Sequence, residues 1–251
     1  MKEAIREKIE GLLSKEYYCS LEELNGKGTV FSVNSDIKKT YIKILAYRNC
    51  VVVCTSKDLA GKMQEILQGK NRDEIFECPF VYGQTIHYVP ENVCTDDALP
   101  SWGYTFDFLF DGDISSLRGV KGFDNSLAFD CDGFTSTKAV CVARRHKEMI
   151  GISGAAESSI NGIWEIGVDV LEKYRNAGLG TALINRLTKE LLIRNIVPFY
   201  SASVTNISSQ MVAGRCGYLP LWVDTFGTVL DGSSAYDSIY DNIMKKQWVC
   251  Q

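Results

Sequence analysis

The sequence has few of the features that mark a metal site or a disulfide framework. It contains only two histidines, His87 and His146, which lie far apart, and its nine cysteines are scattered with no C-x-x-C pair. We therefore expect neither a zinc site nor a disulfide scaffold, and we assign no metal ligand. Cysteines inside apolar runs, such as Cys54 in CVVVCT, are expected to be small core side chains in a reducing cytoplasm.

Long apolar runs and an excess of basic residues are also missing. No stretch approaches the roughly 18 apolar residues of a membrane span. The start, MKEAIREKIEGLL, is charged throughout, which is unlike a signal peptide. With a net charge of -4 and no basic stripe, we expect a cytoplasmic protein with no nucleic-acid and no membrane partner. The mildly acidic balance is compatible with a cationic substrate but does not select one.

The composition is that of a globular protein, with 45% hydrophobic and 23% charged residues in 251 positions. This length allows one large core or two small ones. The polar stretch PENVCTDDALPSWG predicts a boundary near residues 90–102, and hence an N-terminal α/β domain over 1–100 and a second domain over 101–251. Periodicity in the first domain predicts helices in 1–13 and 56–69 and strands in TVFSV, YIKILAYR and VVVCT.

The second half shows a clearer succession of predicted strands and helices. Strands are predicted in YTFDFLF, TKAVCVARR, EMIGISGAA and GIWEIGVDVL, followed by a helix, the strand VPFYSASV, a second helix and the strand PLWVDTF. This order predicts an α/β (α+β) fold with a mixed, mostly antiparallel sheet flanked by helices. The order of elements in 1–100 loosely echoes the second half, which allows a degenerate copy of the same fold there.

The stretch YRNAGLG, residues 174–180, joins a predicted strand to a predicted helix over about 178–194. The helix is indicated by leucines that recur every four residues, namely Leu179, Leu183, Leu187 and Leu191. Helix N-termini present unpaired N–H groups and a partial positive charge, and glycines let the backbone come close to an anion. The stretch therefore predicts a phosphate site, with an ordinary tight turn as the alternative.

Two familiar phosphate loops do not fit this stretch. The P-loop needs a Lys-Ser/Thr pair after its last glycine, but Thr181-Ala182 follows here. The dinucleotide fingerprint needs a third glycine where Leu183 stands.

A third pattern matches. The run from Arg175 to Gly180 has the form R-x-x-G-x-G, which resembles the acyl-CoA loop of the GNAT superfamily of N-acetyltransferases. Downstream, TNISSQMVAGRCGYLP resembles the second signature of that superfamily, an Asn that opens a helix closing with Gly plus an aromatic residue. The resemblance covers roughly residues 103–227 and implies a GNAT-like fold for the second domain.

The resemblance implies which residues hold acetyl-CoA, with CoA as the product. The loop backbone would hold the pyrophosphate and the end of the preceding strand would pair with the pantetheine arm, while an asparagine and a serine would hydrogen-bond to that arm. These residues are Val168, Asp169, Val170, Arg175, Asn176, Ala177, Gly178, Leu179, Gly180, Thr181, Asn206 and Ser209. Two other roles stay open: Asn206 as a simple helix N-cap and Arg175 as a solvated surface residue. Gly167, in mid-strand, indicates a bulge or a close backbone approach.

The resemblance also implies the reaction, transfer of an acetyl group to a primary amine by direct attack on the thioester. A carboxylate is needed to take the amine proton, since an alkylamine with a pKa of about 10.4 is almost fully protonated at pH 7. Glu165 is the first candidate for this base, with Asp169 as the second. Many members carry a tyrosine where Ala213 stands here, so the general acid is open between Tyr218, Tyr200 and Ser201.

Two functions follow for the chain. One is an acetyl-CoA-dependent N-acetyltransferase acting on a small-molecule or peptide amine. The other is a non-catalytic acyl-CoA-binding or sensor module of the same fold, which the departure at Ala213 supports. The pattern also allows a homodimer, and it identifies neither the amine nor the length of the acyl group.

Overall fold

The computed structural model describes residues 3–78, 81–91 and 103–229. The chain forms two compact units, each built from two separate stretches. Unit 1 comprises Met1–Lys8 and Tyr88–Pro220, and unit 2 comprises Ile9–His87 and Leu221–Gln251. The division into domains 1–100 and 101–251 stays a prediction, and most of the boundary expected at 90–102 lies outside the described residues.

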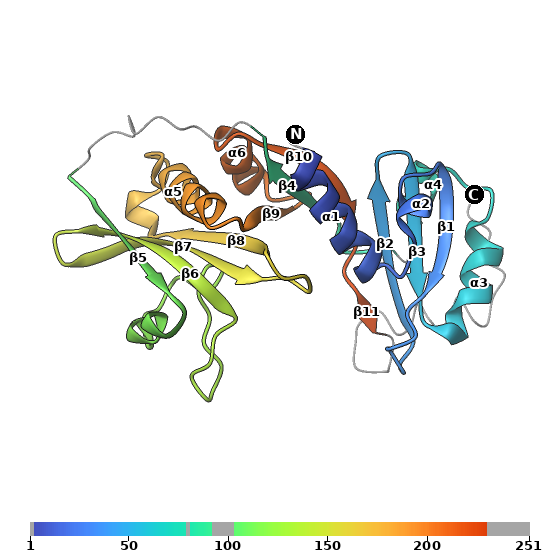
Figure 1. Cartoon of the computed structure of the whole chain (residues 1–251), viewed down its shortest axis with the longest axis horizontal. Helices are drawn as coiled ribbons and strands as arrows, with labels where there is room; N and C mark the ends of the chain where they lie inside the picture. Colours follow the sequence, from blue (N-terminus) through green and yellow to red (C-terminus); the bar gives the residue numbers. More distant parts are fainter. Residues whose placement is uncertain (1–2, 79–80, 92–102, 230–251) are drawn as a thin grey trace. The chain divides into compact units, whose positions relative to one another are not determined.

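Unit 1 is built on a sheet whose strands lie in the order β5-β6-β7-β8-β9 (Figure 1). The strands are β5 (Thr105–Phe110), β6 (Thr137–Arg145), β7 (Glu148–Glu157), β8 (Ile163–Val170) and β9 (Val197–Ser203). Neighbours from β5 to β8 are antiparallel, whereas β8 and β9 are parallel. The predicted mixed, mostly antiparallel sheet is therefore confirmed.

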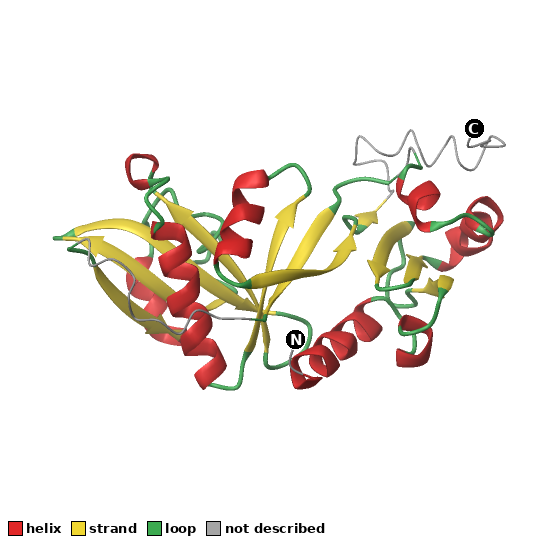
Figure 2. Ribbon diagram, turned by 90° about the horizontal axis from the view of Figure 1, so that it is seen from above, coloured by secondary structure: helices red, strands yellow, loops and turns green. Residues whose placement is uncertain are grey.

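Helices cover both faces of this sheet, as the red and yellow ribbons of Figure 2 show. α5 (Leu179–Ile193) lies across β6, β7 and β8, and all the leucines expected to face the sheet are buried. The short η1 (Asp111–Leu117) packs on the other face, where its Ile114 joins an apolar cluster with Ile152 of β7. After η2 (Glu172–Tyr174), α5 and β9, the chain adds α6 (Ile207–Arg215).

Unit 2 has a smaller sheet in which β3 lies between β1 and β2. β1 and β3 are parallel, and β2 and β3 form an antiparallel hairpin. The elements that begin in the first half of the chain are α1 (Glu3–Glu16), α2 (Leu21–Leu24), β1 (Gly28–Val33), β2 (Tyr41–Tyr47), β3 (Cys50–Thr55), α3 (Lys57–Leu67), α4 (Arg72–Phe76) and β4 (Thr85–Pro90). α3 closes a core cluster of Ile42, Ile44, Val51, Val53, Leu59, Met63, Leu67, Ile75 and Cys78.

The chain returns to this sheet near its end. β10 (Tyr218–Asp224) begins in unit 1, and its last residues pair with β2 in unit 2. β11 (Thr228–Val229) also pairs with β2. Thr225 fixes this return, because its N–H donates to the Ile44 carbonyl at 3.0 Å and its hydroxyl accepts from the Ile44 N–H at 2.9 Å. The short elements α2, α4, η2 and β11 are not among the sequence predictions.

A buried polar cluster surrounds Asp224 in unit 2. The carboxylate accepts from the Tyr17 hydroxyl at 2.7 Å, and it lies 2.8 Å from Nε2 of His87 and 3.2 Å from Nζ of Lys43. The His87 ring stacks on Trp222, with the ring centroids 4.5 Å apart. Burial opposes ionisation of Asp224, but its hydrogen bond to His87 and the nearby charges outweigh burial and lower the pKa of the carboxyl.

Most of the described cysteines lie in the interior. Buried thiols are found at Cys19, Cys50, Cys54, Cys78, Cys141 and Cys216, and Cys131 is exposed. In the described part of the chain, no helix has the length and apolar character needed to cross a bilayer.

Candidate active site

The site begins where two parallel strands part. β8 and β9 pair from Ile163 with Val197 to Ile166 with Tyr200, and the pairing stops there. β8 nevertheless continues to Val170 and stays paired with β7 throughout. The backbone of residues 167–170 thus loses β9 as a neighbour while the strand itself remains fixed, and a cleft opens between the two strands.

Gly167 marks this point by a close backbone approach and not by a bulge. The register of β7 with β8 is unbroken, and Gly167 lies opposite Gly154. A Cβ atom on Gly167 would lie 2.1 Å from the Asn125 carbonyl oxygen, and one on Gly154 would lie 1.8 Å from the Ser126 carbonyl oxygen. A loop segment therefore lies directly on this glycine pair, on the sheet face that α5 does not cover.

The glycine loop forms the N-terminus of α5. Asn176 and Gly178 both have left-handed backbone, with φ of 62° and 81°, which is the conformation that glycine adopts without strain. The first intrahelical bond runs from the Ala182 N–H to the Gly178 carbonyl at 3.0 Å. The N–H groups of residues 179–181 therefore precede the hydrogen-bonded turns and point out of the helix end, toward any anion placed there.

Arg175 has a definite contact at the start of this loop. Its Nε donates to the Val170 carbonyl at 2.9 Å, which ties the loop to the end of β8. The side chain is otherwise exposed, so its other guanidinium N–H groups face solvent beside the loop.

The start of α6 supplies a second polar helix end at the cleft. Asn206 Oδ1 accepts from the Ser209 N–H at 3.1 Å, so Asn206 is the N-cap that the sequence also allowed. The Ser209 hydroxyl accepts from Tyr200 OH at 3.1 Å. Burial raises the pKa of Tyr200, so its hydroxyl stays protonated and able to donate.

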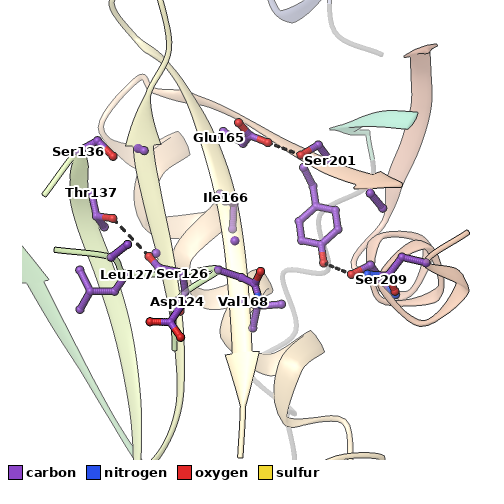
Figure 3. A pocket seen from close by; sticks show the side chains of 18 of the residues that line it. Asp124, Ser126, Leu127, Ser136, Thr137, Glu165, Ile166, Val168, Ser201 and Ser209 are labelled. Atoms are coloured by element: carbon purple, nitrogen blue, oxygen red, sulfur yellow. Dashed lines mark hydrogen bonds between the residues drawn. The ribbon is translucent and has the colours of Figure 1, made fainter. Parts of the chain in front are cut away.

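These elements enclose a cleft of about 360 Å³ (Figure 3). One wall comes from β8, a second from β9 and the start of α6, and a third from the loop after η1. The lining residues are Asp124, Asn125, Ser126, Leu127, Ala128, Ser136, Thr137, Gly154, Ala156, Glu165, Ile166, Gly167, Val168, Tyr200, Ser201, Ala202, Ser203, Asn206 and Ser209. The structure thus brings Glu165, Val168, Asn206 and Ser209 together from the predicted set.

Glu165 is the exposed carboxylate of the β8 wall. Its Oε1 accepts a hydrogen bond from the Ser201 hydroxyl, which comes from the facing strand β9 (Figure 3). The carboxylate therefore has a fixed direction and still has lone pairs free to accept a proton or a further hydrogen bond.

Asp169, the second predicted base, is engaged in a different way. Its carboxylate accepts from Asn125 Nδ2 at 2.6 Å and from the N–H and hydroxyl of Ser126, both at 2.9 Å. These bonds fasten the loop segment onto the Gly154–Gly167 pair. Asp169 and Val170 do not line the cleft.

Tyr218 also lies away from the cleft. It is 1% exposed, and its hydroxyl lies 2.6 Å from Thr188 Oγ1 on α5. Burial raises the pKa of this phenol far above its usual value. The structure therefore gives Tyr218 a packing environment, while Tyr200 and Ser201, the other open candidates, both line the cleft.

Sequence reasoning missed the third wall. The segment 124–128 carries Asp124, Asn125 and Ser126 into the lining, and Ser136 and Thr137 extend it. This part of the chain has no helical or strand periodicity that would have singled it out. The readable signal was indirect: two glycines in predicted strands, Gly154 and Gly167, require another chain segment to approach them.

The candidate site thus combines a parallel strand pair that parts after Ile166 with a glycine loop at the N-terminus of α5. A family model described as GNAT acetyltransferase matches residues 134–220. The match covers β6 to the first residues of β10 and therefore includes β8, the glycine loop and α6.

Several solved structures described as acetyltransferases are similar to this chain at low sequence identity. A GCN5-related N-acetyltransferase-like protein from Streptococcus suis is 18% identical, with 88% of this chain and 98% of that chain covered and a TM-score of 0.48. A GCN5-related N-acetyltransferase from Kribbella flavida is 14% identical, with 61% and 60% covered and a TM-score of 0.44. An acetyltransferase of the GNAT family from Colwellia psychrerythraea is 10% identical, with 58% and 56% covered and a TM-score of 0.43. This chain thus spans less than two thirds of the last two, and no curated protein matches it.

Proposed function

We propose that this chain transfers an acetyl group from acetyl-CoA to the primary amine of a small molecule or peptide. The observation that carries the proposal is the parting of β8 and β9 after Ile166, directly beside the glycine loop of α5. A strand edge without a neighbour and a helix N-terminus that can bind phosphate are the two features that a long, flexible thioester with a pyrophosphate end requires.

The described residues fit acetyl-CoA, the acetyl donor, at its pyrophosphate and along its pantetheine arm. The N–H groups of residues 176–181, with Gly178 in the left-handed conformation, suit the pyrophosphate. The edge of β8 from Gly167 to Val170, which lacks β9 as a neighbour, suits the amide groups of the pantetheine arm. Asn206 would hold that arm through its side-chain N–H₂, since its Oδ1 is used as a cap.

The protein needs to supply little chemistry beyond proton transfer. Bound acetyl-CoA supplies an activated thioester, which a neutral amine attacks directly. In the proposal, the Glu165 carboxylate takes the proton of the incoming ammonium group, directly or through water, with its direction set by Ser201. Tyr200 is proposed to give a proton to the departing thiolate, because its phenol belongs to the cleft lining.

The experiment is thiol release from acetyl-CoA in the presence of a panel of primary amines. Glu165→Gln is expected to lower kcat/KM at pH 7 by about 10²- to 10⁴-fold, the usual contribution of a general base. The loss should shrink toward pH 10, where a free alkylamine is increasingly neutral without help. Glu157→Gln is the matched control, because Glu157 is an exposed carboxylate on the neighbouring strand outside the cleft lining.

A second measurement separates the catalytic proposal from the sensor alternative. Saturating CoA should stabilise the fold by about 2.7 kcal/mol at a hundredfold excess over Kd, seen as a rise in melting temperature. If CoA stabilises the protein but no amine releases thiol, the chain is the non-catalytic acyl-CoA-binding module. If CoA gives no stabilisation, both functions are wrong. The homodimer and the cytoplasmic location remain predictions.

A further inference from the structure

The cleft has an unusual lining for a small-molecule site. Such sites are mostly apolar with a few polar groups, whereas this one contains many hydroxyl and amide side chains and two carboxylates, Asp124 and Glu165. No lysine, arginine or histidine is among its lining residues. The lining therefore carries negative charge with no cation of its own to balance it.

The carboxylate of Asp124 is not engaged by the described part of the protein. Its carboxylate is exposed and makes no hydrogen bond or ion pair with any residue that the structure describes. Glu165, in contrast, is held by Ser201. The two carboxylates thus differ in role: one is oriented within the protein, and the other is left to a group from outside.

The segment that carries Asp124 is held firmly. Its neighbours Asn125 and Ser126 are fastened by the Asp169 carboxylate, and their carbonyl groups lie on Gly167 and Gly154. On the other side of Asp124, Phe123 is buried in the apolar cluster under η1. The backbone of Asp124 is therefore held from both sides, which limits the positions that its carboxylate can take in the cleft.

The two carboxylates lie at different heights along β8. In Figure 3, Glu165 lies beside Ser201, whereas Asp124 lies farther along β8, nearer to Val168. A ligand that satisfies both must carry two separated positive groups. A volume of about 360 Å³ is at the small end for ligand sites, and in the proposed function part of it, beside Asn206, is taken by the pantetheine arm, so the acceptor must be compact.

We propose that the acceptor amine is a small, hydrophilic dication, in which one ammonium group is acetylated at Glu165 and a second is bound by Asp124. This inference rests on the proposed function. Asp124 is then a residue that determines specificity, and Asp169 is a positioning residue that holds the segment carrying Asp124. An acceptor with a distal carboxylate would face Asp124 with like charge and should be rejected.

Three amines of similar length test the inference by thiol release: 1,5-diaminopentane, 1-aminopentane and 6-aminohexanoate. We expect kcat/KM to fall in that order, with the diamine about 5- to 10-fold above the monoamine, as a partly exposed charge-assisted hydrogen bond allows. The advantage should decrease from 50 to 500 mM salt, because ionic screening weakens the distal pair.

Asp124→Asn should reduce the ratio of diamine to monoamine kcat/KM to near one, mainly through KM for the diamine. Asp132→Asn is the control, since Asp132 is an exposed carboxylate of the same loop outside the cleft lining, and it should keep the ratio. Equal use of diamine and monoamine by the wild type, or an unchanged ratio in Asp124→Asn, would overturn the inference.

Failure of the proposed function gives a different result. If no amine releases thiol, calorimetry of 1,5-diaminopentane binding to the CoA-loaded protein decides the matter separately. Binding that Asp124→Asn weakens and Asp132→Asn does not would support the dication site without catalysis. Binding that is absent, or equal in both variants, would overturn it.

Discussion

Replacing Gly154 with alanine tests how closely the loop segment 123–128 presses on the sheet. The new Cβ atom would lie 1.8 Å from the Ser126 carbonyl oxygen and 2.8 Å from its carbon. Real Cβ contacts are not found below 3.0 Å, so the Ser126 carbonyl must retreat by about 1.2 Å or the strand must yield. The backbone of Gly154 itself has no positive φ, so the clash is the whole perturbation.

The expected loss of stability comes from two sources. Overpacking of this kind costs about 1–3 kcal/mol. The movement also stretches the two bonds from Ser126 to the Asp169 carboxylate, each about 1 kcal/mol because the site is partly exposed. We expect a decrease of about 2–4 kcal/mol in the free energy of unfolding, which corresponds to roughly 5–15 °C in melting temperature for a chain of this size.

Thermal and urea unfolding followed by circular dichroism measure this loss. The control is Gly214→Ala in α6, where a Cβ atom meets nothing within 4 Å and alanine should raise stability by up to about 1 kcal/mol. Hydrogen exchange of residues 123–128 locates the effect. A Gly154→Ala protein as stable as the wild type, with unchanged exchange in this segment, would refute the reasoning. If the variant does not fold, Asp169→Asn should still raise exchange in the segment without unfolding the chain.

Two further predictions concern buried polar groups. Tyr218→Phe should reduce stability by about 1–2 kcal/mol in urea unfolding, because it leaves the Thr188 hydroxyl buried without its partner, while kcat/KM stays unchanged; a large loss of activity at unchanged KM would instead give Tyr218 a catalytic role. Asp224→Asn should reduce stability at pH 7 by about 2–3 kcal/mol, less than for a fully buried pair because 22% of the Lys43 side chain is exposed. Since the folded pKa of Asp224 is lowered, its contribution is complete above the unfolded pKa of about 3.9 and is lost as pH falls below that value. Urea titrations at pH 7, 4 and 3 should therefore show the difference between wild type and Asp224→Asn shrinking, and a constant difference would contradict the assignment.

The regular elements were predictable because their periodicity is local. The short apolar runs of β6 and β7 and the leucine spacing of α5 read directly as strands and a helix. The short helices α2 and α4 were missed although both carry a readable capping box, with Ser20 before Glu23 and Asn71 before Glu74. Four or five residues leave no room for an apolar repeat, so only the caps could have revealed them.

The candidate site was only half predictable. The glycine loop and Glu165 stand in contiguous, patterned sequence, so their place on a helix end and a strand could be inferred. The contact of Asn125 and Ser126 with Gly154 and Gly167 joins segments that no local pattern connects. It follows from packing, as does the role of Asp169, whose carboxylate could equally have faced the cleft.

Because unit 2 is built from two separate stretches of the chain, it cannot be completed until the second stretch has been synthesised. Its sheet receives Asp224 and Thr225 from a stretch made well over a hundred residues after His87. At about 5–20 residues per second, the nascent unit waits on the order of ten seconds for the strand that completes it. During that wait, Tyr17, Lys43 and His87 lack the carboxylate they share. The first half of this chain therefore cannot complete its fold until the strand from the second half has been made.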